Sequence, residues 1–151
     1  MNYIKYQCDL IKMYDKDKRI KIRWDYTDID RKKLIMTIDG FVACIIPLES
    51  FYLSDQFKNA SARWTGFHQL ISGLDQYEDA NEWKIMQEGK KQLFKLTANE
   101  RFAWIDSKKL KYFDHENMNL KIKDKISPVM VYENGTLVGF VMPVRRNEEG
   151  K

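Results

Sequence analysis

The chain has 151 residues and a mass of 18.1 kDa, which favours one domain, and its 44% hydrophobic and 13% aromatic content is enough for a packed core. Its 7 glycines and 3 prolines exclude collagen-like and low-complexity classes, and the sequence lacks both the apolar run of roughly 20 residues typical of a membrane span and a signal-peptide core, so we expect a soluble cytoplasmic protein. The net charge of +4 is uneven, with +3 on residues 1–47, −3 on residues 48–90 and +4 on residues 91–151, a pattern compatible with a polyanionic partner.

Residues 1–47 form the first of two predicted units, a helix followed by three strands. The helix is predicted where apolar side chains recur every three or four residues. The first strand is predicted where apolar and charged side chains alternate, with Asp25 on the charged side. A hairpin turn is predicted at Asp39-Gly40, because these residue types most readily adopt positive φ. In chain order the predicted elements are a helix at residues 3–17 and strands at residues 20–26, 34–38 and 41–46, the last closed by Pro47.

Residues 48–90 form an acidic connector that is too long for a plain loop, so we expect it to have structure of its own. Residues 48–57 are open to two interpretations, a short helix or an irregular docking segment. A second apolar stretch spans residues 64–74 and is interrupted by two glycines. Residues 75–89 are acidic and permit a helix.

Residues 91–146 form the second predicted unit and repeat the order of helix and strands. Its helix is predicted at residues 102–113, where aromatic and aliphatic side chains fall in helical period. Asn134-Gly135 predicts a second hairpin turn, at the place that matches Asp39-Gly40 in the first unit. We therefore expect one α+β domain over residues 1–151, with two pseudo-repeats of a helix packed on antiparallel strands. The predicted strands of this unit are residues 92–97, 119–123, 129–132 and 137–144.

The sequence offers little for catalysis or metal binding. The two cysteines and two histidines show no metal-ligand spacing, and the apolar surroundings of Cys8 and Cys44 favour buried free thiols over a disulfide. Glu78, Asp79 and Glu82 are interpreted as a solvated acidic face, since nothing else converges on them. A phosphate loop, a nucleophile elbow and a dinucleotide fingerprint are all missing from the sequence. We therefore expect a non-enzymatic protein without cofactor or metal.

Short segments in both units resemble the bacterial DNA sliding clamp (beta clamp) family. Residues 34–41, which read LIMTIDGF, resemble the clamp segment in which a strand ends in Thr-Asp-Gly. Residues 127–132 and 138–145 resemble the closing hairpin of the clamp, which ends in Met-Pro-x-Arg. The resemblance implies a single clamp-like domain acting as a DNA-replication accessory. A clamp subunit joins three such domains, so a chain with room for one looks like a phage or prophage product.

The resemblance also implies two binding surfaces. Clamp helices direct basic side chains toward phosphates, a contact that requires no reading of bases, and the C-terminal clamp strand borders a groove for short peptides. The matching candidates for DNA binding are Lys5, Lys12, Lys16, Lys108, Lys109 and Lys111. The matching candidates for peptide binding are Val141, Met142, Pro143 and Val144.

The implied partners are double-stranded DNA, a polymerase or another clamp-binding protein, and further copies of this chain. The alternative hypothesis is a phage-encoded interaction or inhibitory protein that has a clamp-like fold and no DNA role. Salt-dependent DNA binding separates the two hypotheses. The tryptophans, which are interpreted as core or interface anchors rather than stacking platforms for bases, are Trp24, Trp64, Trp83 and Trp104.

Overall fold

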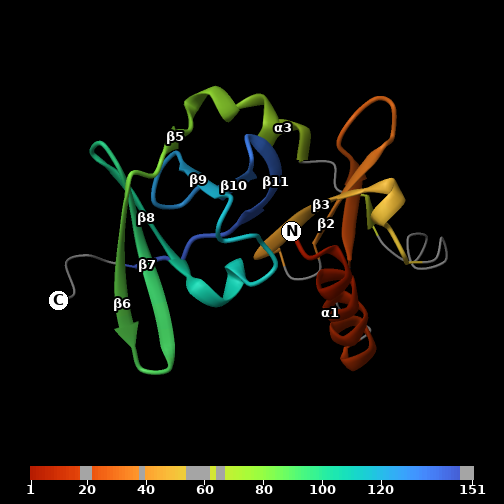
Figure 1. Ribbon diagram of the computed structural model, residues 1–151, viewed down its shortest axis with the longest axis horizontal. Helices are drawn as coiled ribbons and strands as arrows, with labels where there is room; N and C mark the ends of the chain where they lie inside the picture. Colours follow the sequence, from red (N-terminus) through yellow and green to blue (C-terminus); the bar gives the residue numbers. More distant parts are fainter. Residues whose placement is uncertain (18–21, 38–39, 54–61, 64–66, 147–151) are drawn as a thin grey trace.

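The computed structural model, which describes residues 1–17, 22–37, 40–53, 62–63 and 67–146, is a mixed α+β fold built on two sheets (Figure 1). The large sheet contains, in spatial order, β4 (Ala62–Arg63), β1 (Arg23–Tyr26), β2 (Lys33–Thr37), β3 (Val42–Pro47), β11 (Thr136–Val141), β10 (Val129–Glu133), β9 (Met118–Ile122) and β5 (Glu78–Asp79). The small sheet contains β6 (Glu82–Glu88), β7 (Lys91–Ala98) and β8 (Arg101–Asp106). The helices are α1 (Tyr3–Lys16) and α3 (Phe67–Ser72), with 3-10 turns η1 (Leu48–Ser50), η2 (Leu74–Gln76) and η3 (Ser107–Leu110).

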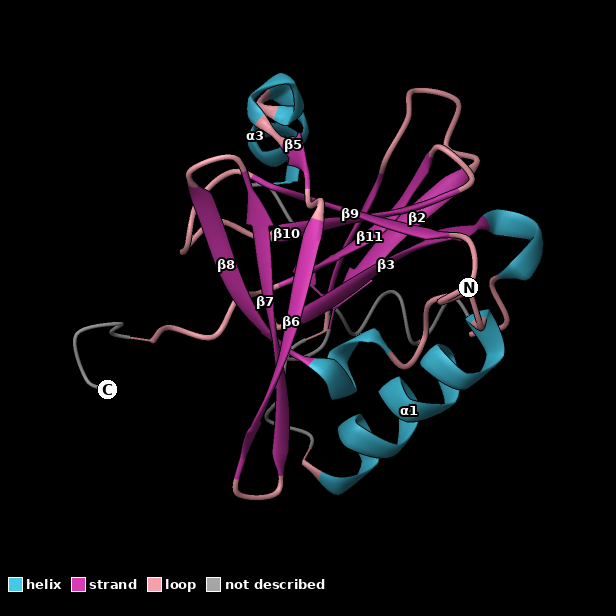
Figure 2. Cartoon of the chain, turned by 60° about the vertical axis from the view of Figure 1, so that its left-hand side comes forward, coloured by secondary structure: helices cyan, strands magenta, loops and turns pink. Residues whose placement is uncertain are grey.

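Both faces of the large sheet are covered by other elements. Figure 2 shows α1 on one side of this sheet and α3 on the other, with the small sheet standing across its strands. In β3, Cys44 and Ile46 contribute to a core that includes side chains of α1 and the small sheet, whereas Ala43 and Ile45 contribute to a second core with Phe67 of α3. Because neighbouring residues of β3 enter different cores, the strand is hydrophobic along nearly its whole length.

The helix α1, which confirms the predicted first helix, is fixed to the large sheet by two buried polar side chains. The Tyr6 hydroxyl donates to the carbonyl oxygens of Met36, at 2.5 Å, and Val42, at 3.1 Å, and so joins the helix to β2 and β3. The side chain of Gln7 donates from Nε2 to the Ser50 carbonyl oxygen at 2.8 Å, which holds the segment after β3 against the same helix. These bonds satisfy polar groups inside the core, where an unpaired group would destabilise the fold.

The two predicted groups of three strands occupy the two halves of the large sheet. The strands β1–β3 form one antiparallel meander and β9–β11 form another, and the two meet where β3 pairs with β11, with Gly139 opposite Cys44. The turn at Asn134-Gly135 is confirmed, since both residues have positive φ, 50° and 80°, as a two-residue hairpin turn requires. Gly40 also has positive φ, 75°, while Asp39 of the other predicted turn lies outside the described residues.

The predicted helix at residues 102–113 is wrong. The chain turns at Asn99, which has a φ of 54°, and continues as β8, paired with β7 along its length, before the short turn η3. Ala103 and Ile105 join the main core, whereas Phe102 and Trp104 lie on the other face of the strand, which is strand periodicity. A helix is predicted because the same aromatic and aliphatic residues also fit the three-to-four-residue spacing of a helix. The described structure therefore does not show two helix-containing repeats, and the clamp-type domain stays a prediction.

Residues 75–89, whose acidic composition permits a helix, contain the strands β5 and β6. Strand β6 pairs with β7 from Glu82 opposite Thr97 to Glu88 opposite Lys91, and Gly89, with a φ of 60°, makes the turn. A charged composition permits a helix or an edge strand, and pairing with β7 selects the strand. In the connector, the sequence leaves residues 48–57 open to a short helix or an irregular segment: the 3-10 turn η1 occupies Leu48–Ser50, residues 51–53 are irregular, and residues 54–61 lie outside the described part.

Three further expectations change. The Asp25 side chain, predicted on the solvent side of its strand, is only 4% exposed, and its Oδ2 lies 3.7 Å from Nε2 of His68. The two cysteines are both free, but only Cys44 is buried and Cys8 is exposed on α1. The final strand ends at Val141 rather than at residue 144. Among the described residues we find no helix with the length and apolar character needed to cross a membrane.

Candidate nucleic-acid interface

One face of α1 carries the three lysines predicted to contact DNA. Lys5, Lys12 and Lys16 follow one another at helical spacing, and Asp9 lies between them on the same face. All three lysines are exposed, while Tyr6 and Leu10 on the adjoining face are buried against the sheet. The amphipathic pattern that folds the helix therefore also directs these lysines to solvent.

The second predicted group of lysines lies beside this face, although it sits on the turn η3 and the residues after it rather than on a helix. Tyr112 donates its hydroxyl to Oδ2 of Asp9 at 2.8 Å, and Nζ of Lys111 lies 3.3 Å from the same oxygen. The rings of Tyr6 and Tyr112 meet edge to face, with centroids 4.9 Å apart. Asp9 thus joins two segments that are about a hundred residues apart in the chain.

The charge of Asp9 is fixed by these contacts. Burial, the largest effect, acts to raise its pKa, but the hydrogen bonds from Tyr112 and Lys111 and the nearby charge of Lys12 together hold the pKa below its ordinary value. Asp9 is therefore ionised at neutral pH and offsets one lysine. The other lysines around it keep an excess of positive charge on this surface.

The remaining two lysines differ in how far their side chains are exposed. Lys108 is exposed, and its backbone N–H is capped by Asp106 at 3.0 Å. Lys109 is half-buried, with Nζ 4.4 Å from the centroid of the Phe41 ring. We call the six predicted side chains the lysine rim, which consists of Lys5, Lys12, Lys16, Lys108, Lys109 and Lys111.

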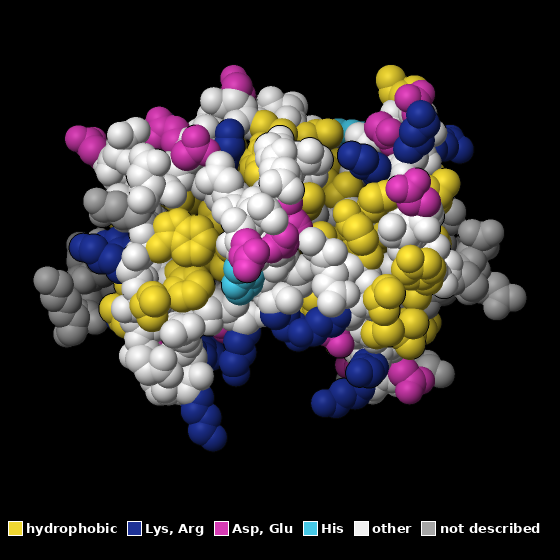
Figure 3. All heavy atoms as spheres, in the orientation of Figure 1, with side chains coloured by type: hydrophobic (Ala, Val, Ile, Leu, Met, Phe, Trp, Pro, Cys, Tyr) yellow, Lys and Arg dark blue, Asp and Glu magenta, His cyan; other side chains and the backbone are white. Residues whose placement is uncertain are grey.

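Figure 3 shows Lys and Arg side chains gathered along the lower edge of the molecule, around an indentation. In the same view Figure 1 places α1 to the right of this edge and the hairpin of β6 and β7 to the left. A concave surface bordered by cations concentrates positive potential, because the low-dielectric walls focus the field. The arrangement can hold a polyanion by contacts to phosphate oxygens without reading bases.

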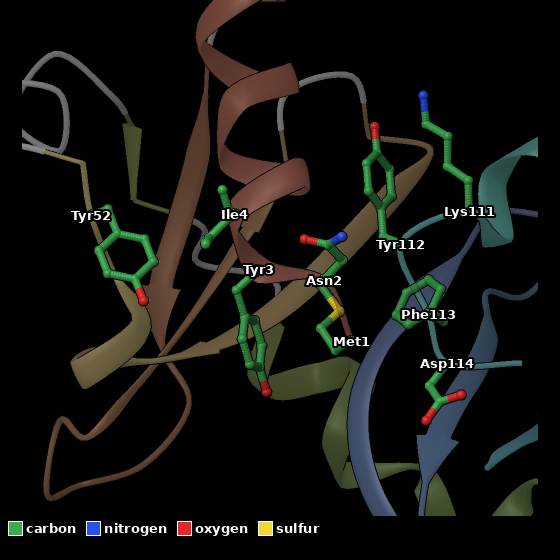
Figure 4. A pocket seen from close by; sticks show the side chains of 9 residues that line it. All are labelled: Met1, Asn2, Tyr3, Ile4, Tyr52, Lys111, Tyr112, Phe113 and Asp114. Atoms are coloured by element: carbon green, nitrogen blue, oxygen red, sulfur yellow. The ribbon is translucent and has the colours of Figure 1, made fainter. Parts of the chain in front are cut away.

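An open pocket of about 550 Å³ adjoins the rim at the start of α1 (Figure 4). Tyr3, Ile4 and Tyr52 lie on one side of it, and Lys111 and Tyr112 lie on the other. Sequence reasoning missed this pocket, since its walls come from three segments that no motif connects. The aromatic walls suit a flat group next to the rim, and the lining carries charges of both signs, from Lys111 and Asp114.

The four residues predicted to bind a peptide differ in burial. Val141 is fully buried in the main core, on a strand that lies between β3 and β10. Met142 donates its N–H to the Phe41 carbonyl at 2.7 Å and packs against the second core. Val144 donates its N–H to the Trp104 carbonyl at 2.7 Å. Met142, Pro143 and Val144 retain partial exposure, so peptide binding at these three residues stays a prediction.

The acidic group is dispersed by the strands that carry it. Glu78 accepts a hydrogen bond from Asn99 at 3.0 Å, and Asp79 accepts one from Asn119 at 2.8 Å. Within the part of the chain that the structure describes, no three acidic, histidine or cysteine side chains are placed to hold a metal ion.

Comparisons with protein-family models, with curated proteins and with solved structures find no match to this chain. The resemblance to sliding clamps therefore rests on the short segments of sequence named above and stays a prediction.

Proposed function

We propose that this protein is a non-enzymatic nucleic-acid-binding protein whose lysine rim contacts phosphates, with double-stranded DNA as the leading ligand. The observation that carries the proposal is the convergence of the two lysine groups. Lys12 and Lys111 come from segments about a hundred residues apart and lie around the same carboxylate, Asp9. A surface held by phosphate contacts needs this kind of cation cluster and no particular base-reading side chain.

The clamp resemblance supplies the finer hypothesis, a DNA-replication accessory with a clamp-type domain that also engages a polymerase or another clamp-binding protein. The two meanders of the large sheet support it by their order, since each predicted group of three strands forms one half of that sheet. Solution mass by light scattering tests whether copies of the chain assemble into a ring.

The direct test reverses two exposed rim charges. The double variant Lys12→Glu with Lys108→Glu should weaken binding of a labelled DNA duplex by more than about tenfold, because two phosphate contacts become repulsive. The slope of log K against log salt should fall by about 2. Both side chains are exposed, so circular dichroism should show an unchanged fold.

The matched control is Lys32→Glu with Lys33→Glu, which makes the same change in net charge on exposed lysines. These lysines lie at the end of the turn between β1 and β2, drawn in orange at the top of Figure 1, away from the rim. Equal losses in both double variants would mean that net charge alone drives binding. No duplex binding by the unaltered protein at low salt would overturn the proposal.

A protein-binding role without DNA is the second candidate function. Ile4 and Ile11 lie on one flank of α1 at helical spacing and are 61% and 45% exposed, and Tyr52 nearby is 64% exposed. Exposed apolar side chains that cluster in this way are typical of interaction surfaces. Retained partner binding by a variant that has lost DNA binding would favour this role.

A further inference from the structure

A second pocket, of about 130 Å³, lies away from the rim, where the chain after β11 crosses the small sheet. We call residues 142–146 the tail segment. It is held to β8 by the bond from the Val144 N–H to the Trp104 carbonyl at 2.7 Å. The pocket is lined by Phe102 and Trp104 of β8, Lys125 of the loop after β9, and Arg145 and Arg146 of the tail segment, among others.

The charged side chains that line this pocket are all cations. Its lining includes three cations and no acidic residue. Two carboxylates lie next to the lining: Glu88 is 3.6 Å from Nη1 of Arg146, and Asp124 accepts the N–H of Ile126 at 2.9 Å. Lys95 adds a fourth cation at its border, with Nζ 4.8 Å from the centroid of Phe102. Such a lining favours an anionic group.

The pocket also offers aromatic surface. The guanidinium of Arg146 lies 5.0 Å from the centroid of Trp104, and Phe102 is partly exposed. Because Trp104 is nearly buried, Phe102 is the aromatic side chain of the pocket that a ligand can reach.

We propose that this pocket binds one unpaired nucleotide, with the base against Phe102 and the phosphate at Lys125 and Arg145. Cations beside aromatic rings are the means by which proteins hold single strands, since every base has a face that can stack and every nucleotide has a phosphate. The inference deepens the proposed function and rests on it, because it makes single-stranded nucleic acid a ligand of the protein whose rim contacts phosphates.

The test compares two probes on the full chain. The first is a fluorescein-labelled oligothymidylate of about twelve nucleotides, within the site sizes of single-strand-binding proteins, and the second is the duplex of the same length. Phe102→Leu, which keeps an apolar side chain, should weaken single-strand binding by about fivefold to a hundredfold, the range expected for lost stacking. Lys125→Gln should also weaken it, and should lower the slope of log K against log salt by about 0.7, because one phosphate contact is lost. Duplex binding should change by less than about twofold.

Lys33→Gln is the control, because it removes an exposed cation on β2, away from the pocket. If Phe102→Leu lowers the thermal midpoint of unfolding, only the result for Lys125→Gln is used. The Lys125 side chain is exposed, so its substitution should not disturb the fold. Unchanged single-strand binding in Lys125→Gln, or equal losses for both probes, would overturn the proposal. An abasic strand that binds as tightly as the oligothymidylate would overturn the role of the base.

Thymidine monophosphate distinguishes the source of the nucleotide. Displacement of the strand by the monophosphate supports a pocket that accepts a free nucleotide, and failure of displacement with intact effects of both variants supports a pocket for a nucleotide within a strand. The same variants distinguish failure of the rim proposal from failure of the pocket proposal. If the Lys12→Glu, Lys108→Glu variant retains duplex binding while Lys125→Gln loses single-strand binding, the rim proposal is wrong and the pocket proposal is supported. If the first variant loses duplex binding while Lys125→Gln retains single-strand binding, the pocket proposal is wrong and the rim proposal is supported.

Discussion

The two sheets of this protein use their faces differently. In the large sheet, Leu34 and Ile35 are neighbours on β2, and both are fully buried because α1 and α3 cover opposite faces. In the small sheet, Leu96 and Ile105 are fully buried on one face, while the other face carries Lys84 and Lys95, with Nζ of Lys95 4.8 Å from the centroid of Phe102. The difference teaches that both faces of the large sheet supply the core, whereas one face of the small sheet stays partly open to solvent. Substitutions in the two sheets should therefore have different consequences.

The largest effect is expected at the centre of the large sheet, where β11 passes close to β3. A Cβ at Gly139 would lie 2.2 Å from the carbonyl oxygen of Ala43 and 3.1 Å from the ring of Phe113. Gly139→Ala should therefore lower the free energy of unfolding by about 3 kcal/mol or more, because a backbone oxygen cannot move aside. Urea unfolding checks it. The control is Gly73→Ala, where the nearest atom to the added Cβ is 3.9 Å away, and a similar loss there would contradict the steric explanation.

An intermediate effect separates the two sheets directly. Leu34→Ala in β2 should cost about 2–5 kcal/mol, since the side chain is fully buried and leaves a cavity. Ile85→Ala in β6 should stay within about 0.5 kcal/mol, because that side chain is 68% exposed. Chemical denaturation of both variants measures the contrast. Comparable losses would show that the small sheet is as much a part of the core as the large one.

The smallest effect is expected at Asp9, which joins α1 to the residues that follow η3. Asp9→Asn should lose about 1 kcal/mol at pH 7, because the carboxylate accepts hydrogen bonds from Tyr112 and Lys111. Since the pKa of Asp9 is lowered in the folded state, its contribution is fully present above the ordinary value of 3.8 and is lost as pH falls through the lower folded value. Unfolding curves of the two proteins should therefore converge below pH 3.8. A gap that persists in acid would assign the loss to packing.

Much of the large sheet could be predicted from sequence, because its signals are local. The turn at Asn134-Gly135 requires two residues that accept positive φ, and the helix α1 has an apolar stripe that no strand would need. The small sheet could not be predicted in the same way. Phe102 and Ile105 satisfy both helical and strand spacing, and only pairing with β7 decides between them.

In the candidate site, too, local sequence signals could be predicted and contacts between distant segments could not. The lysines of the rim could be proposed from a resemblance, but their meeting depends on the contact of Asp9 with Tyr112, which has no sequence signature. Val141 was assigned to a groove because its segment matched a clamp motif, and pairing on both sides of β11 instead places it in the core. The aromatic and cationic pocket joins β8, a loop and the tail segment, so only the fold brings its parts together.

The pairing of β3 with β11 also sets the order in which the molecule can form. Gly139 lies opposite Cys44, so the central ladder of the large sheet closes a loop that includes most of the chain. Ladders of this kind form slowly, because the entropy cost of closing a long loop comes before the stabilising contacts between the strands are made. During synthesis, α1 and α3 are available to cover the faces of β1–β3, but the edge of β3 that pairs with β11 stays open until β11 has left the ribosome. Aggregation during expression should therefore be governed by these early strands, and should ease at low temperature or with a chaperone that shields them.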